Sequence, residues 1–180
     1  MLGNELNNMS QRIADNVPTP TSIALMVNDT VTSIHLRSYD IGDEGAIALA
    51  KALMVNNTVI SIELRRNHIG DEGAKALAEA LKESKHLTSI ALVCPFIGAG
   101  AIALVKVLIV NNAVTSLNLW GNFFGDESAI ALASALKKNT TVTSIELSDN
   151  HIGDEGAKAL AEALKENKHL TSIDLSCNRI

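Results

Sequence analysis

The sequence predicts an α/β solenoid, in which repeated strand and helix pairs stack so that a concave parallel β-sheet lines one side and α-helices cover the outside. The residues HIGDEGAKALAEALKE occur at 68–83 and again at 151–166, and the match extends to Ile90 and Ile173 with one difference, Ser84 against Asn167. A signature of the form VTSIEL also recurs at intervals of 27 or 28 residues, starting at Val31, Val59, Leu87, Val114, Val142 and Leu170. Such self-similarity at a fixed period is typical of stacked repeats.

Residues 1–30 precede the first complete unit, and we expect them to form a helical cap and a degenerate half repeat. Apolar residues recur at helical spacing in this segment, which favours a short helix over 4–15, and these are Leu2, Leu6, Met9 and Ile13. Residues 24–31, ALMVNDTV, closely match ALMVNNTV at 52–59, where a repeat helix ends. A strand over 22–25 is the alternative. The repeat domain then covers 31–180, as five units and a partial sixth.

Each unit begins with a predicted strand. In the signature at 142–147, the apolar residues Val142, Ile145 and Leu147 partly alternate and are rich in β-branched side chains, as in a short strand with one buried side. The residues at its third, fifth, seventh and eighth letters should then face the concave side of the arc.

Each unit continues with a predicted helix. In the unit at 142–169, one apolar face repeats at i, i+3, i+4 and i+7 and consists of Ala157, Leu160, Ala161 and Leu164. Asp154 and Glu155 fall at the positive N-terminal end of this helix. Alanine at the inner positions allows close approach of helix and sheet with no loss of helix propensity.

An asparagine column follows the strands and consists of Asn67, Asn122, Asn150 and Asn178. We expect these amides to point inward and to bind backbone groups of the turns that stack along the array. Tyr39 and Pro95 occupy the same column. We therefore expect two irregular turns at these positions.

Composition excludes several partners and locations. The chain has 180 residues, 47% of them apolar but only 3% aromatic, which predicts one domain with an aliphatic core. A net charge of -5 without a Lys/Arg run argues against nucleic acid and against anionic membranes. The uncharged run 87–105 contains Pro95 and Gly98, so we do not interpret it as a membrane span. No signal-peptide pattern is visible, and we expect a cytoplasmic location.

Cysteine and histidine positions give no sign of catalysis. Cys94 and Cys177 share a repeat column three strands apart, a separation of about 14 Å, which is too long for a disulfide or a shared metal. His68 and His151 are also far apart, and each is interpreted as a structural residue of a turn. We find no nucleophile paired with a base, no phosphate-binding loop and no zinc spacing. The sequence predicts no enzyme activity and no cofactor.

The pattern LxxLxLxxNxIGDEGAxxLAxALxxN resembles ribonuclease-inhibitor-type leucine-rich repeats, and matching copies run from Val31 to Asn178. The resemblance implies a horseshoe with a concave sheet. It covers relatives as different as ribonuclease inhibitors, NOD-like immune receptors, Ran GTPase activators and effectors of intracellular bacteria, which share the scaffold and differ in partner. It implies no catalytic residues.

The concave positions run from basic through apolar to acidic. Trp120 is the only tryptophan, and its neighbours in the array include Val93 and the loop residues Phe96 and Phe123, a composition typical of an interface anchor. We expect a protein partner to bind there, through Trp120, Val93, Phe96, Arg37, Arg65, Arg66, Glu146 and Asp149. A solvated surface with Trp120 covering the sheet edge is the alternative.

Two other surfaces are candidates for self-association. Some helices carry outward apolar residues where others carry Lys or Glu, and these are Ile47, Met54, Val55, Ile102, Ile109 and Val110. Burial of these residues in the grooves between helices is the alternative. The last predicted strand, around Ile173 and Leu175, is an open sheet edge.

The sequence therefore predicts a non-enzymatic protein-interaction module, in the cytoplasm of its own cell or of a host if the protein is exported. Binding would require only a preformed curved surface. A GTPase-activating regulator that resembles the Ran activators is the second interpretation. A structural repeat fragment with no partner of its own is the third.

Overall fold

The computed structural model describes residues 28–94 and 99–180. The predicted helix over 4–15, most of the predicted half repeat, Pro95 and Phe96 lie outside these residues. Within the described chain, the strands are β1 (Ser33–His35), β2 (Ser61–Glu63), β3 (Ser89–Ala91), β4 (Ser116–Asn118), β5 (Ser144–Glu146) and β6 (Ser172–Asp174). The helices are α3 (Gly42–Val55), α4 (Asp71–Glu83), α5 (Ala99–Val107), α6 (Gly125–Leu136) and α7 (Asp154–Glu166).

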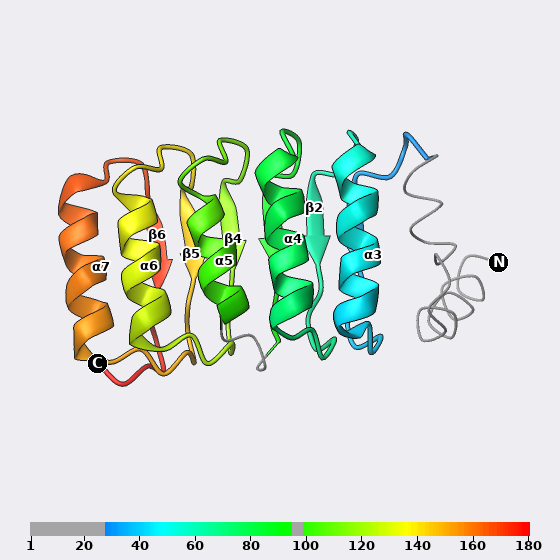
Figure 1. Ribbon diagram of the computed structural model, residues 1–180. Helices are drawn as coiled ribbons and strands as arrows, with labels where there is room; N and C mark the ends of the chain where they lie inside the picture. The colour runs from blue at the N-terminus through cyan, green and yellow to red at the C-terminus, as the bar shows by residue number, and fades with distance from the viewer. Residues whose placement is uncertain (1–27, 95–98) are drawn as a thin grey trace.

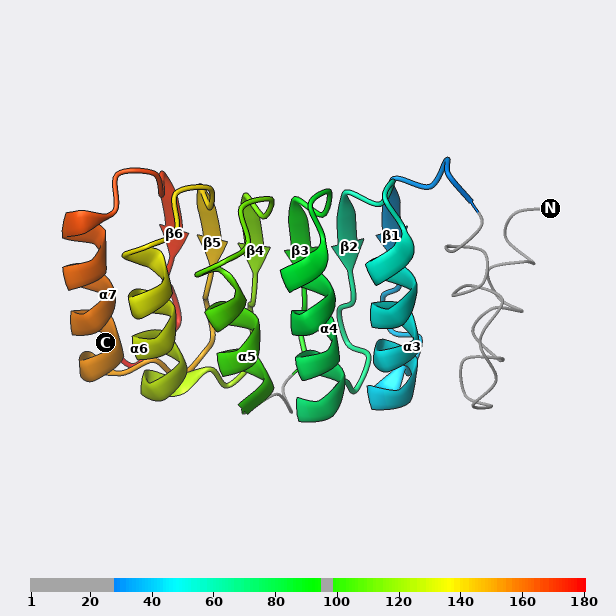
Figure 2. The same ribbon diagram turned by 45° about the horizontal axis from the view of Figure 1, so that its top comes forward.

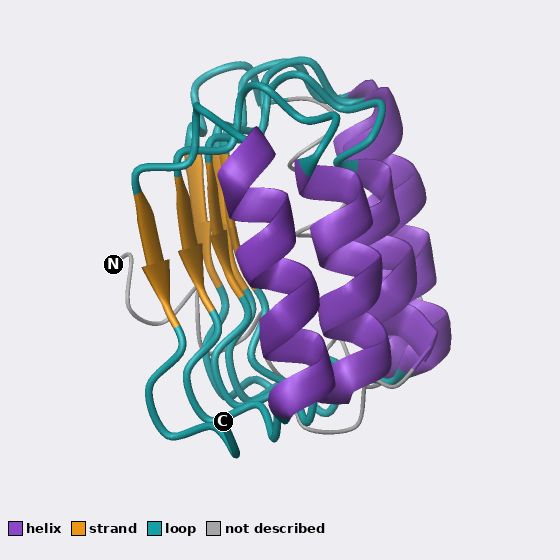
Figure 3. Ribbon diagram, turned by 90° about the vertical axis from the view of Figure 1, so that its left-hand side faces the viewer, coloured by secondary structure: helices purple, strands orange, loops and turns teal. Residues whose placement is uncertain are grey.

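The strands and helices form two layers, with the helices side by side on one face of the sheet (Figures 1 and 2). Figure 3 shows the strands and the helices as separate layers, joined by loops at both edges. The sheet is parallel, and its strand order β1 to β6 follows the chain. Each strand pairs with the next without offset, so that Ser33 lies beside Ser61 and Ser61 beside Ser89. The predicted stack of strand and helix pairs is confirmed.

The core lies between the two layers. The middle residue of each of the first five strands is buried, as Ile62 and Ile90 show, whereas the residues before and after it face away from the helices. From the helices, alanines such as Ala46, Ala74 and Ala129 are fully buried. These alanines lie where neighbouring helices approach closely, since a Cβ on Gly73 would lie 2.9 Å from Ala46 Cβ. Close approach of helix and sheet through small residues stays a prediction.

Aspartates cap helices, but they cap the helix of the following unit. Asp43 Oδ1 accepts hydrogen bonds from Gly70 N at 2.7 Å and Gly73 N at 2.9 Å, at the start of α4. Asp126 makes the same two contacts at the start of α7. A Cβ on Gly73 would lie 2.7 Å from Asp43 Oδ1, so glycine is required here by close approach. The carboxylate thus links neighbouring units at the positive ends of the helices.

The asparagine column binds turn backbone groups as predicted. Asn150 Oδ1 accepts hydrogen bonds from Asn122 N and Phe124 N at 3.0 and 3.2 Å, and its Nδ2 donates to Leu119 O at 2.8 Å. The other three asparagines make corresponding contacts with a neighbouring unit. These amides satisfy buried backbone groups from one unit to the next.

The two turns without this asparagine differ from each other. Ser38 and Asp40 flank Tyr39 with φ of 61° and 55°, as the matching residues do in units that contain asparagine. The expected irregularity is therefore absent at Tyr39. At the other turn, Cys94 lacks the positive φ that Arg66 has at the same position of its unit. The irregular turn expected at Pro95 itself lies outside the described residues.

Cys94 also corrects the prediction that the eighth letter of each signature faces the concave side. Its side chain is fully buried, and its Sγ donates a hydrogen bond to Leu64 O at 3.6 Å. Asn122 and Asn150 donate to the corresponding carbonyls of their neighbours, so the thiol takes the place of the missing amide. Burial raises the pKa of the Cys94 thiol above its ordinary value. Cys94 is thus a core residue.

A second row of amides lies at the other edge of the array, and the sequence analysis missed it. Asn139 Nδ2 donates to Leu108 O at 2.8 Å and Asn111 O at 3.3 Å, and its Oδ1 accepts from Val142 N at 2.8 Å. Asn111 and Asn167 make the same kinds of contact. An asparagine after most of the helices was the available signal.

Candidate protein interface on the sheet face

The candidate site is the surface of the sheet opposite the helices, which we call the sheet face. Its most regular feature is a row of serines that lie in register across all six strands. Within the described chain, none of these six hydroxyls has a hydrogen-bond partner. The row consists of Ser33, Ser61, Ser89, Ser116, Ser144 and Ser172. It offers donors and acceptors to another molecule along the whole array.

The threonines that precede Ser89, Ser116, Ser144 and Ser172 differ from the serines, because their hydroxyls bind within the chain. Thr88 Oγ1 donates to Ile60 O at 3.1 Å, and Thr143 Oγ1 donates to Thr115 O at 3.2 Å, so these hydroxyls bind the preceding strand. Thr115 and Thr171 do the same. The threonines therefore stabilise the stack, whereas the serines remain available.

The basic end of the sheet face comprises His35, Arg37, Glu63, Arg65 and Arg66. Glu63 lies between His35 and Arg65, with Oε2 3.3 Å from His35 Nδ1 and Oε1 3.1 Å from Arg65 Nε. The Arg65 contact is an ion pair only, because the buried Nε of Arg65 has no hydrogen-bond partner among the described residues. Arg37 and Arg66 are exposed. Since this end has three guanidinium groups and one carboxylate, its net charge is positive.

The centre of the sheet face is Trp120, which follows β4 and is 38% exposed. Asn118 Oδ1 accepts a hydrogen bond from Trp120 N at 3.1 Å, which holds the backbone at this position. No residue of the described chain binds the indole N–H. Val93 is only 4% exposed, so it lies beneath the surface and offers little contact area of its own. Phe96, the third predicted anchor, falls in the undescribed segment.

The acidic end comprises Glu146, Asp149 and Asp174. Glu146 Oε1 accepts from Ser148 N at 2.9 Å, and Asp174 Oδ1 accepts from Ser176 N at 2.8 Å. The latter contact lowers the pKa of Asp174 below its ordinary value. Asp149 is exposed. In these units, the side chain at the fifth position of the signature accepts a hydrogen bond from the backbone N–H at the seventh position, as Asn118 does from Trp120. The sequence analysis did not predict this contact.

The two repeated histidines contact neighbouring turns. His68 Nδ1 lies 2.7 Å from Asp40 Oδ1, and both side chains are exposed. The ring of His151 packs against Phe123, with centroids 4.7 Å apart. Phe123 is 55% exposed, so it adds an aromatic surface to the loop after Trp120. Neither contact pairs a histidine with a nucleophile.

The six apolar residues of the outer helices that were predicted for self-association differ in exposure. Ile47 and Ile102 are partly buried, as the alternative interpretation required. The other four, Met54, Val55, Ile109 and Val110, are exposed. Met54 and Val55 lie at the C-terminal end of α3, and Ile109 and Val110 lie just after α5. In α4, which lies between these two helices, the matching residues are Lys82 and Glu83.

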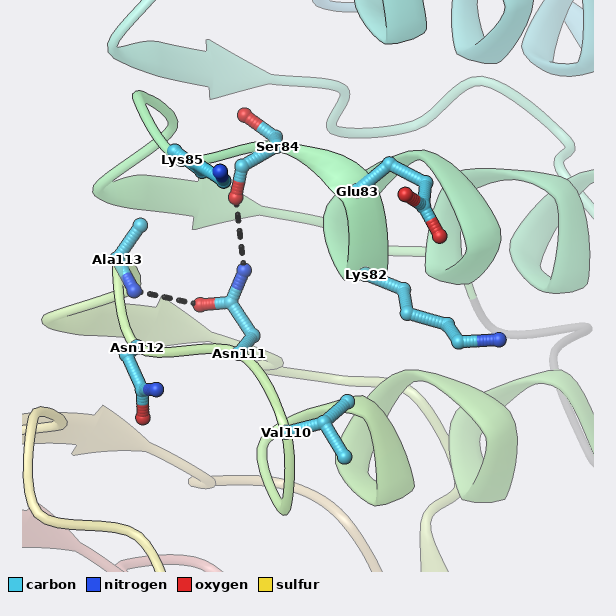
Figure 4. Close-up of a pocket in the computed structure, with 8 residues that line it drawn as sticks. All are labelled: Lys82, Glu83, Ser84, Lys85, Val110, Asn111, Asn112 and Ala113. Carbon is cyan, nitrogen blue, oxygen red and sulfur yellow. Dashed lines mark hydrogen bonds between the residues drawn. The ribbon is translucent and has the colours of Figure 1, made fainter.

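A pocket of about 330 Å³ lies at that edge, between the end of α4 and the loop after α5 (Figure 4). Its lining residues are Lys82, Glu83, Ser84, Lys85, Val110, Asn111, Asn112 and Ala113. Asn111 Nδ2 donates to Ser84 O, and its Oδ1 accepts from Ala113 N, as the dashed lines show. The Asn111 amide is thus used in hydrogen bonds within the chain. Among the described residues, no group of His, Cys, Asp and Glu could hold a metal ion.

Comparison with known proteins supports the repeat assignment. A family model described as leucine-rich repeat matches residues 27–50, 55–78, 110–133, 138–161 and 166–180, which is more than half of the chain. The chain belongs to the leucine-rich repeat family. The unmatched residues 79–109 of this leucine-rich repeat protein include α5 and Cys94, which lacks the positive φ of Arg66. The ribonuclease-inhibitor-like subtype stays a prediction.

Two solved structures resemble this leucine-rich repeat protein in fold. One is described as leiomodin-1 actin-binding site 2, with a TM-score of 0.64, 23% identity, and coverage of 89% of this chain and 87% of the other. The second is the tropomodulin C-terminal domain of Caenorhabditis elegans, with a TM-score of 0.68, 16% identity, and coverage of 81% and 90%. No curated protein matches the sequence. Within the described chain, no helix is both long and apolar enough to cross a membrane.

Proposed function

We propose that this protein is a non-enzymatic interaction module that binds a protein partner on the sheet face, with Trp120 at the centre of the interface. The observation that carries the proposal is an exposed tryptophan with an unpaired indole N–H, on a rigid sheet whose serine row is also unpaired. Aromatic side chains with a polar group are enriched at the centres of protein interfaces. Cys94 and Cys177 are free thiols, which supports a cytoplasmic location.

The decisive experiment compares capture of cytosolic proteins by the wild type, Trp120→Ala and Ile130→Ala. Ile130 is 48% exposed on α6, in the same repeat unit as Trp120 but in the helix layer. A partner that binds the sheet face should lose at least about tenfold in affinity with Trp120→Ala and should be unaffected by Ile130→Ala. Equal capture by all three proteins would contradict the proposal.

Actin is the first defined protein to test. Leiomodin-1 actin-binding site 2 shares the fold over most of this chain, which justifies the test without assigning the partner. Co-sedimentation with filaments and binding to monomeric actin, each with wild type and Trp120→Ala, would show whether this chain binds actin and through which surface. Binding that Trp120→Ala leaves unchanged would place actin away from the sheet face.

A further inference from the structure

The charges of the sheet face are segregated along the array. The basic end is carried by β1, β2 and the residues that follow them, and the acidic end by β5, β6 and the following Asp149. The sheet-face positions of the last two units contain no basic residue, and Arg37 and Arg66 at the other end make no ion pair within the described chain. Trp120 lies between the two ends. A partner therefore meets positive, apolar and negative surface in that order.

The serine row runs in the same direction as this charge gradient. Because the six strands pair in register, the hydroxyls form one line across β1 to β6, about 24 Å long at roughly 4.8 Å per strand. An extended chain rises about 3.3 Å per residue, so about seven residues would cover the line. Extended backbone has free N–H and C=O groups that unpaired hydroxyls can bind.

We propose that the partner binds through an extended bipolar segment that crosses the strands beside the serine row, between the serines and the residues that follow the strands. Its acidic residues contact the basic end, its basic residues contact the acidic end, and an apolar residue between them packs on Trp120. Opposite charges at both ends fix the orientation of the segment as well as its position. This inference rests on the proposed function and specifies which partner the sheet face accepts.

Labelled peptides of about ten residues with identical composition test this charge order. Two carry Glu at one end, Lys at the other and Leu-Tyr-Leu between them, in the two chain directions, and a third alternates Glu and Lys around the same centre. Net charge and apolar content are equal, so only the order of charges differs. We expect one segregated peptide to bind at least about tenfold tighter than the alternating one, with affinity that falls as salt rises.

A matched pair of double variants then locates the contact. Arg37→Glu with Arg66→Glu should weaken the favoured peptide about tenfold. Lys51→Glu with Lys106→Glu changes the net charge equally on exposed residues of α3 and α5 and should change affinity less than about twofold. Circular dichroism of each variant checks that the fold is retained.

Equal affinity for all three peptides, no binding by either segregated peptide at about 1 mM, or equal losses in both double variants would each overturn the inference. These outcomes are distinct from failure of the proposed function. A protein partner lost with Trp120→Ala would still support binding on the sheet face, even if the peptides showed no preference for charge order.

Discussion

The segments His68–Ile90 and His151–Ile173 differ only at Ser84 and Asn167, yet the structure buries them differently. In α4, the buried residues are Gly73, Ala74, Leu77, Ala78, Ala80 and Leu81, whereas in α7 only Gly156, Leu160 and Ala163 are buried. The helix of the following unit, α5, packs against α4, and no helix of the described chain follows α7. Burial in this repeat is therefore set by the neighbouring unit as much as by the sequence of the unit itself.

The largest difference between the copies is expected for their matched leucines. Leu81 is buried, and Leu81→Ala should lower the free energy of unfolding by about 2–5 kcal/mol because it leaves a cavity between α4 and its neighbours. Leu164 is partly exposed, so Leu164→Ala should cost only about 1 kcal/mol. Urea unfolding of both variants measures the difference. Equal losses would show that burial does not distinguish the two copies.

Enlarging a matched alanine should also destabilise the first copy more than the second. Ala78 is buried and Ala161 is exposed at the matching position. Ala78→Leu should destabilise by about 1–3 kcal/mol because the added atoms have no space, whereas Ala161→Leu should change stability by less than about 0.5 kcal/mol. Thermal unfolding of the two variants provides the comparison. If both destabilise equally, α7 is as closely covered as α4.

The single sequence difference between the copies should also be measurable. Asn167 Nδ2 donates to Leu136 O and Asn139 O at 2.7 and 3.1 Å, whereas Ser84 Oγ only accepts, from Leu87 N at 3.1 Å and more distantly from His86 N. Asn167→Ser should therefore cost about 1–2 kcal/mol, because it removes the donor to two backbone carbonyls. Ser84→Asn should restore the amide row and gain about 0.5–1 kcal/mol. Loss of stability in both variants would contradict this role of the row.

The fold could be predicted because the repeat period is visible in the sequence itself. A fixed spacing places equivalent residues side by side in every unit, so strand order, register and the asparagine column followed from one alignment. The difference in burial between α4 and α7 could not be predicted in this way, since the two helices have the same sequence. The thiol of Cys94 was also missed, because its acceptor Leu64 O lies 30 residues away and no local pattern indicates that contact.

The candidate site could be predicted only in part. Arg37 and Trp120, which the alternation of the strands assigns to the sheet face, are both exposed. The contact of Asp174 Oδ1 with Ser176 N was not anticipated, because a charged residue on a strand was interpreted only as a surface for a partner. Val93 was expected at the surface, but the backbone after β3 buries it together with Cys94.

The smallest effect should occur where both copies face solvent. Lys75 Nζ lies 2.6 Å from Glu72 Oε1, Lys158 Nζ lies 2.9 Å from Glu155 Oε1, and all four side chains are largely exposed. The hydrogen bond to the carboxylate raises the pKa of each lysine above its ordinary value, so any stabilisation is complete at neutral pH and is lost only as pH rises through the raised pKa.

Solvent screens such pairs, and Lys75→Gln and Lys158→Gln should each shift Tm at pH 7 by less than about 2 °C, and by the same amount. Calorimetry at neutral pH makes the comparison. A larger shift for Lys75→Gln would mean that the neighbouring units influence even the outward face of α4. Equal small shifts would confine the difference between the copies to the residues that contact the following unit.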